Sequence, residues 1–295
     1  MTEFRFNAMG TAWSITLDGV TDRDVPVSLW DKVVTSTDNF EQRFSRFIEG
    51  SEVTAFRTAP AGTYPLSKEL TILLAQSHVV RELTGGAFDP AIGTLLEKAG
   101  YDQQYSFHPQ DQELDNWRLP GWNVDVAQQQ VTISDAVVFD TGGIGKGYWI
   151  DQLSQLIFEA GYPYHLVDGG GDMVATTKEN YAGWQVAIEW PGDQERAIGV
   201  VELHNQGFAA SDIFRRRWGE WHHLINVTER QPVGNIKGCV AVAASAWSAD
   251  QMTSALALVQ PEAYEHIGHA LGAEYLVLLQ SDQAIISPQW PGEVF

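Results

Sequence analysis

A lysine and four glycines lie close together in the middle of the chain, where residues 140–147 read Asp-Thr-Gly-Gly-Ile-Gly-Lys-Gly. The apolar run Ala136–Phe139 before them predicts a buried strand, and the apolar spacing after residue 150 predicts a helix. A strand, a glycine turn and a helix N-terminus can bring backbone N–H groups to a phosphate, and Lys146 adds a positive charge. The glycine order matches neither common nucleotide fingerprint, so the spacing leaves a tight glycine connection equally open.

An aspartate and a serine four residues apart form a second pattern. We expect a helix to begin at Asp250, which places Asp250 and Ser254 on one helix face. A carboxylate and a hydroxyl in this arrangement are oxygen ligands that Mg²⁺ accepts. The residue types alone favour a plainer interpretation, in which Asp250 only caps the helix.

Two adjacent histidines, His222 and His223, can supply acid–base chemistry near neutral pH. Because side chains alternate along a strand, one histidine should face inward and the other outward. Ordinary packing of both is the more common outcome for such a pair. Asp89, which follows Phe88, has three interpretations: a metal ligand, a partner of a ribose hydroxyl, or a cap of the next helix.

Composition limits the classes of function. The 295 residues include 18 Lys and Arg against 38 Asp and Glu, a net charge of −20, which counts against nucleic-acid binding and requires local compensation at any phosphate site. The single cysteine, Cys239, excludes an internal disulfide and a thiolate-rich metal site. No apolar run reaches the length of a membrane span, so we expect no membrane insertion. No signal pattern opens the chain, so we expect a cytoplasmic location, or the cell envelope if the sequence is a trimmed form.

Helices and hairpin-linked strands are mixed without regular alternation, which predicts an α+β fold. Helical spacing predicts a helix over about 27–44 and another from Ser67, its N-cap, to Gly85-Gly86. Residues 101–120 are polar and lack periodicity, which predicts a surface loop. No linker divides the chain, so we expect residues 1–295 to form one large domain, with a mixed, mainly antiparallel sheet and packed helices.

The order of short motifs along the chain resembles the FAD:protein FMN transferase (ApbE-like) family, from about residue 4 to residue 280. The motifs that carry the resemblance are Met9-Gly-Thr11, Ser45-x-Phe47, Gly86-Ala-Phe-Asp89-Pro, Asp140-x-Gly-Gly-Ile-Gly-Lys-Gly, Gly170-Gly-Asp172, His223-x-Ile225 and Asp250-x-x-x-Ser254. The glycine motif and the late aspartate motif are the most characteristic of these.

The resemblance implies an ApbE-like fold and a Mg²⁺-dependent enzyme that splits the pyrophosphate of FAD. FMN would pass to a Thr or Ser hydroxyl of a target flavoprotein, with release of AMP. Matching motif positions imply a metal held by the carbonyl of Gly143, the carboxylate of Asp250 and the hydroxyl of Ser254, with His223 as the catalytic histidine. The implied contacts to FAD are Met9, Phe47, Ala87, Phe88, Asp89, Asp140, Lys146 and Ile225.

The chain departs from the family pattern after the histidine. The family usually reads H-I-I-D-P-x-T-G there, whereas this chain reads His-Leu-Ile-Asn-Val-Thr-Glu-Arg over residues 223–230. Loss of the proline and the glycine predicts a different loop on the acceptor side. Two alternatives therefore stay open beside the transferase: an FAD pyrophosphatase that uses water as acceptor, and an FAD-binding protein without turnover.

Overall fold

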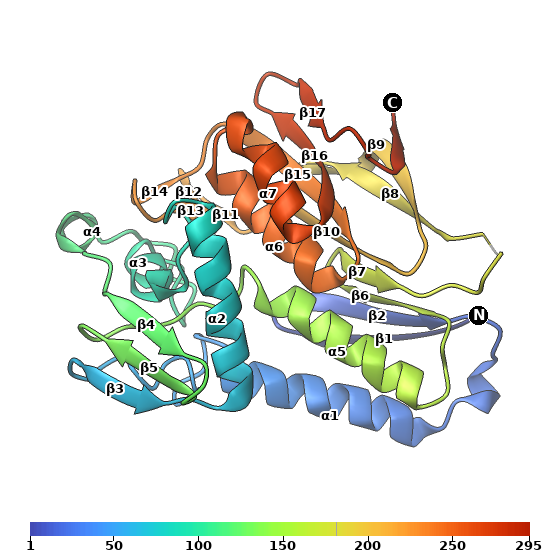
Figure 1. Ribbon diagram of the computed structural model, residues 1–295, viewed down its shortest axis with the longest axis horizontal. Helices are drawn as coiled ribbons and strands as arrows, with labels where there is room; N and C mark the ends of the chain where they lie inside the picture. Colours follow the sequence, from blue (N-terminus) through green and yellow to red (C-terminus); the bar gives the residue numbers. More distant parts are fainter. Residues whose placement is uncertain (181) are drawn as a thin grey trace. The chain divides into compact units, whose positions relative to one another are not determined.

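The structure is a computed structural model that describes residues 1–180 and 182–295 (Figure 1). Its residues form two compact units, and neither is continuous in sequence. The first unit contains Met1–Phe40, Ile144–Arg215 and Gly234–Phe295, and the second contains Glu41–Gly143 and Arg216–Val233. The expectation of one domain over residues 1–295 stays a prediction.

An eight-stranded sheet forms the centre of the first unit, in the order β1-β2-β6-β7-β10-β15-β16-β17, and every neighbouring pair is antiparallel. This sheet and the helices around it confirm the α+β class. The strands are β1 (Thr2–Ala8), β2 (Thr11–Leu17), β6 (His165–Gly169), β7 (Asp172–Ala175), β10 (Gln206–Asp212), β15 (Ile236–Ala243), β16 (Ala273–Leu279) and β17 (Ala284–Ile286).

Helices and a smaller sheet pack on this centre. The buried helix α6 contacts β10 and β15, where Cys239 Sγ lies 3.3 Å from the carbonyl oxygen of Thr253. A three-stranded sheet, β18-β9-β8, shares an apolar core with the large sheet through residues such as Ile188, Phe208 and Leu276. The remaining elements are η1 (Asp22–Asp24), α1 (Val27–Phe44), α5 (Gly145–Glu159), α6 (Ala246–Leu258), η3 (Pro261–Ala263), α7 (Tyr264–Leu271), β8 (Trp184–Trp190), β9 (Asp193–Leu203) and β18 (Gly292–Val294).

The second unit contains shorter elements around an apolar cluster that includes Leu95, Tyr101, Trp218 and Ile225. Its three-stranded sheet has the order β3-β5-β4, and α2 contacts β4. The elements are β3 (Gly62–Pro65), α2 (Lys68–Leu83), η2 (Pro90–Ile92), α3 (Gly93–Lys98), α4 (Asp111–Asn116), β4 (Trp122–Asp125), β5 (Gln130–Ile133), β11 (Arg217–Trp218), β12 (Trp221–His222), β13 (Ile225–Asn226) and β14 (Gln231–Pro232).

The predicted helix over residues 27–44 is confirmed, and so is the Ser67 cap, whose hydroxyl accepts a hydrogen bond from Leu70 N at 3.1 Å. The predicted strand at 136–139 is wrong. Val137, Val138 and Phe139 are buried and Ala136 is partly buried, but the backbone bonds of this run go to irregular segments, as from Val137 N to the carbonyl of Phe56, so no ladder forms. The expected loop at 101–120 contains α4.

The length and hydropathy of the helices bear on the expectation of no membrane insertion. In residues 1–180 and 182–295, no helix combines the length and the hydropathy needed to cross a bilayer.

Candidate functional site

The residues predicted to form the site are divided between the two units. Met9, Lys146, Asp250 and Ser254 belong to the first unit. The second unit holds Phe47, Ala87, Phe88, Asp89, Asp140, Gly143, His223 and Ile225.

The first turn of α5 meets the middle of α6 through a close backbone approach. Gly147 N donates a hydrogen bond of 2.8 Å to Asp250 Oδ2. A Cβ at position 147 would lie 2.5 Å from the carbonyl oxygen of Ala246 and 2.7 Å from Asp250 Cβ, so only glycine fits here. Asp250 and Ser254 are only 5% and 6% exposed and lie one helical turn apart. The glycine motif therefore serves to bring α5 against the aspartate motif.

The interpretation of Asp250 as a helix cap is wrong, because α6 begins at Ala246 and Ser245 caps it by accepting from Ser248 N at 3.1 Å. No sequence motif singled out Asp151, yet its two carboxylate oxygens accept from Ala246 N and Trp247 N, both at 3.0 Å. Burial raises the pKa of Asp151 although these hydrogen bonds oppose the shift. Asp151 thus fixes the start of α6 and, through it, the position of Asp250.

Lys146 makes an ion pair in the first unit, with Nζ at 2.5 Å from Asp172 Oδ2. The side chain of Asp172 is 3% exposed, and its other oxygen accepts from Ala210 N at 3.1 Å. Burial raises the pKa of the neighbouring Asp168, and the charge of Asp172 adds to that increase. The lysine is therefore held in place by the aspartate of the second glycine cluster.

Met9 lies in the two-residue turn between β1 and β2. Its φ is 52° and that of Gly10 is 69°. Positive φ at both central residues is typical of a type I′ hairpin turn, whose twist matches that of the strands. The predicted contact of Met9 with FAD stays a prediction.

In the second unit, Asp140 and Phe47 are linked through Arg46, whose side chain is 2% exposed. Arg46 Nε lies 2.5 Å from Asp140 Oδ2, and its Nη1 donates to the carbonyl of Tyr101 at 2.7 Å. The guanidinium carbon lies 4.1 Å from the ring centroid of Phe47, a cation–π distance. A buried arginine therefore holds both predicted FAD contacts, and the sequence motifs did not single it out.

The residues Ala87, Phe88 and Asp89 are all buried. Asp89 Oδ1 accepts from Ala91 N at 2.8 Å and from Trp122 Nε1 at 2.9 Å, and its Oδ2 pairs with Arg81 Nε at 2.7 Å. Burial still raises the pKa of Asp89. Of the three interpretations of Asp89, the structure supports the cap, and the predicted contact with FAD stays a prediction.

The two histidines differ in exposure, since His222 is buried and His223 is intermediate, but β12 ends at His222, so the predicted strand through both histidines is wrong. His222 Nδ1 accepts from Leu224 N at 3.2 Å, so Nε2 carries the proton and donates to the carbonyl of Val233 at 2.9 Å. His222 is thus a packing residue. Ile225 lies in the apolar cluster beside Phe47.

The loop after His223 is an ordered turn in spite of its departures from the family pattern. Asn226 Oδ1 accepts from Thr228 N at 3.0 Å and from Glu229 N at 3.2 Å. Arg230 has a φ of 57°, a left-handed conformation that a glycine would adopt without strain. Its guanidinium donates to the carbonyl of Asp115 at 3.1 Å, which compensates part of that strain. The substituted loop is therefore held by side chains of its own.

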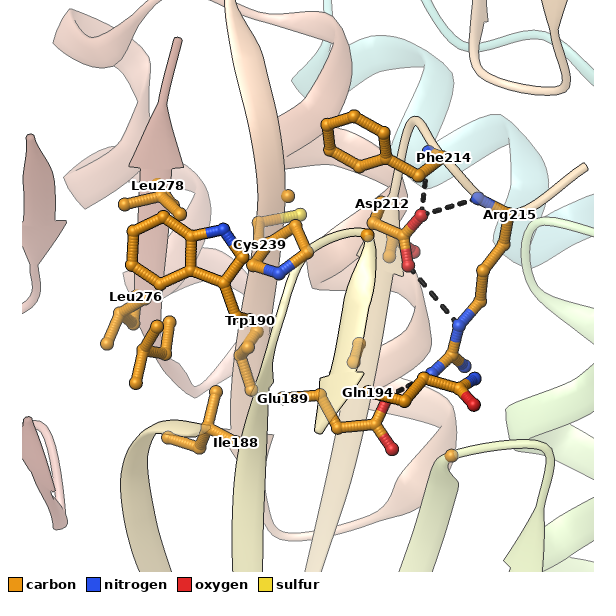
Figure 2. A pocket seen from close by; sticks show the side chains of 18 of the residues that line it. Ile188, Glu189, Trp190, Gln194, Asp212, Phe214, Arg215, Cys239, Leu276 and Leu278 are labelled. Atoms are coloured by element: carbon orange, nitrogen blue, oxygen red, sulfur yellow. Dashed lines mark hydrogen bonds and ion pairs between the residues drawn. The ribbon is translucent and has the colours of Figure 1, made fainter. Parts of the chain in front are cut away.

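A cavity of about 290 Å³ opens in the first unit between the β8–β9 hairpin and the large sheet (Figure 2). Trp190, Leu276 and Leu278 form its apolar wall. The charges at its edge pair with one another, because Arg215 contacts both Glu189 and Asp212. None of the residues predicted from sequence to form the site lines this cavity.

Comparison with known proteins agrees with these motifs. The family model described as the ApbE family matches residues 9–277. A FAD:protein FMN transferase of Escherichia coli K12 is 24% identical over 98% of this chain and 88% of its own length. One of Klebsiella pneumoniae is 26% identical over 96% of this chain and 86% of its own length.

Solved structures show the same fold. The ApbE protein of Thermotoga maritima has a TM-score of 0.84 at 22% identity, and the flavin transferase ApbE of Vibrio cholerae has 0.81 at 17%, each covering 97% of both chains. Because the family model spans most of the sequence and the motifs lie in the expected order, the chain belongs to the ApbE family.

Proposed function

We propose that the protein is a Mg²⁺-dependent FAD:protein FMN transferase that acts on a Thr or Ser of a target flavoprotein. The observation that carries the proposal is the junction of α5 and α6. There Asp250 accepts from Gly147 N, and Lys146 lies at the N-terminus of a 15-residue helix. A helix N-terminus and a lysine attract phosphate, and the curated relatives bear the name of this activity.

The proposed metal ligands are the carbonyl of Gly143, the carboxylate of Asp250 and the hydroxyl of Ser254. This set fits Mg²⁺, which commonly takes one or two carboxylates and completes its shell with water and substrate phosphates. Among the described residues, no cluster of three or more His, Cys, Asp or Glu could hold a metal. When bound, the ion neutralises charge on the pyrophosphate.

The chain's own residues then perform three tasks. Lys146 neutralises part of the remaining phosphate charge, which answers the repulsion expected from a net charge of −20. Met9, Phe47, Ala87–Asp89, Asp140 and Ile225 hold the FAD. His223 accepts the proton of the acceptor hydroxyl. The hydroxyl oxygen bonds to the phosphorus of the FMN half, and the P–O bond that joins this phosphorus to AMP breaks, so that AMP leaves.

Hydrolysis of FAD to FMN and AMP is the second candidate. The loop over Asn226–Arg230 favours it, because its side-chain bonds replace the proline and glycine of the family beside the proposed catalytic histidine. In this case water takes the place of the protein hydroxyl.

The test follows AMP release from FAD by chromatography, with Mg²⁺ or EDTA and with or without a threonine-bearing flavoprotein. We expect metal-dependent AMP and flavin attached to the acceptor. Asp250→Ala and Ser254→Ala should abolish both, while Ser254→Thr retains them because the hydroxyl remains. Asp282→Ala, which removes a surface carboxylate paired with Lys237 in the same unit, is the matched control. Free FMN without labelled acceptor supports the hydrolase, and full activity of Asp250→Ala refutes the metal assignment.

A further inference from the structure

One loop of the second unit leaves two large aromatic side chains in solvent. Tyr105 is 46% exposed and Phe107 is 42% exposed. Both have left-handed backbones, with φ of 51° and 53°, a conformation that side chains of this size rarely adopt. Large rings that stay about half exposed on a strained backbone are candidates for a binding role.

The loop is braced into one shape. Asp102 Oδ1 accepts from Gln104 N and from Ser106 N, both at 3.0 Å, and Phe107 N donates to the carbonyl of Gly100 at 2.8 Å. These bonds hold the two aromatic residues in place before any ligand arrives, which lowers the entropic cost of binding.

The two rings contact one another, with centroids 6.0 Å apart, and otherwise have different neighbours. The ring of Tyr105 stacks on Phe47, with centroids 5.1 Å apart and planes at 13°. The ring of Phe107 lies against Trp218 instead, at 5.6 Å. Phe47 is one of the proposed FAD contacts, so Tyr105 extends that contact while Phe107 does not.

We propose that Tyr105 is a further FAD-binding residue, and that a planar ring of FAD stacks on its exposed ring beside Phe47. This inference rests on the proposed function, in which Phe47 contacts FAD. The Phe47 ring already supports that of Tyr105 by stacking, and a flavin or adenine ring that packs on the solvent-exposed part of Tyr105 extends this stack.

The test measures dissociation constants of the full-length protein for FAD, FMN and ADP in EDTA, so that no turnover occurs. Tyr105→Gly should weaken FAD binding about ten-fold, the loss typical of one stacked ring, whereas Tyr105→Phe should keep it within about three-fold. The matched control is Phe107→Gly, which relieves the same backbone strain on the same loop and, because Phe107 only borders the Tyr105 ring, should cost less affinity than Tyr105→Gly. A parallel loss for FMN assigns the flavin ring, and one for ADP assigns adenine.

The melting temperature separates binding from a structural role. Glycine relieves the left-handed strain in both variants but removes ring contacts from each, so Tyr105→Gly and Phe107→Gly should melt at similar temperatures while Tyr105→Gly binds FAD less tightly. The inference is overturned if Tyr105→Gly binds all three ligands as the wild type does or more tightly, or if Phe107→Gly loses as much affinity. Wild-type protein that binds no FAD either in EDTA or with Mg²⁺ would refute the proposed function as well.

Discussion

Replacing Gly147 by alanine tests the α5–α6 junction directly. The added methyl would lie 2.5 Å from a backbone oxygen of α6, so the helices must separate by about 1 Å to restore ordinary contact. Such overpacking costs about 1–3 kcal/mol, and the better helix propensity of alanine returns up to about 1 kcal/mol. We expect a net loss of about 1–2 kcal/mol in the free energy of unfolding, measured by urea titration.

The same displacement moves the Asp250 carboxylate, and a misplacement of about 1 Å can cost about 100-fold in rate. Metal-dependent AMP release from FAD should therefore fall about 100-fold in Gly147→Ala, far more than the stability change explains. Gly234→Ala is the matched control, because a Cβ there meets no atom within 4 Å. Wild-type activity in Gly147→Ala would refute the argument that the close approach positions Asp250.

Three further predictions concern buried groups. Asp172→Asn should lower the free energy of unfolding, measured in urea, by about 3 kcal/mol, because it leaves the Lys146 ammonium without its carboxylate. Adding Lys146→Met to Asp172→Asn should restore most of this loss. An Asp172→Asn variant as stable as the wild type would contradict the prediction. Because the pKa of Asp151 is raised in the folded protein, its contribution to stability falls as pH rises from about 4 through that pKa. In urea titrations, the stability of the wild type relative to Asp151→Asn should therefore decrease over this pH range. A constant difference would contradict the raised pKa. Burial raises the pKa of the Cys239 thiol, so the folded protein should not react with a disulfide reagent at pH 8 and should react once unfolded; rapid reaction of the folded protein would contradict its burial.

Local patterns were sufficient for some features and insufficient for others. The Ser67 cap and the helix after it follow from neighbouring residues, so the sequence predicted them. The partners of the site residues could not be predicted in this way: Asp172 lies 26 positions after Lys146. The apolar run at 136–139 has strand composition, but its backbone bonds go to Phe56 and Val53 in loops, which no local pattern reveals. Asp250 looked like a cap because the start of α6 at Ala246 was not evident from spacing.

The discontinuity of both units affects how the chain folds during synthesis. In the large sheet, β15 lies between β10 and β16. Helix α6 packs on β15 and comes after β15 in sequence, so this part of the first unit forms late. The second unit needs residues as late as Val233, so a ribosome must release more than two thirds of the chain before either unit is complete. The early hairpin β1–β2 waits for β6, well over a hundred residues later, with an unpaired strand edge. We therefore expect nascent chains to depend on chaperone binding during translation, and no single cut of the sequence to yield a fragment that holds a whole first unit.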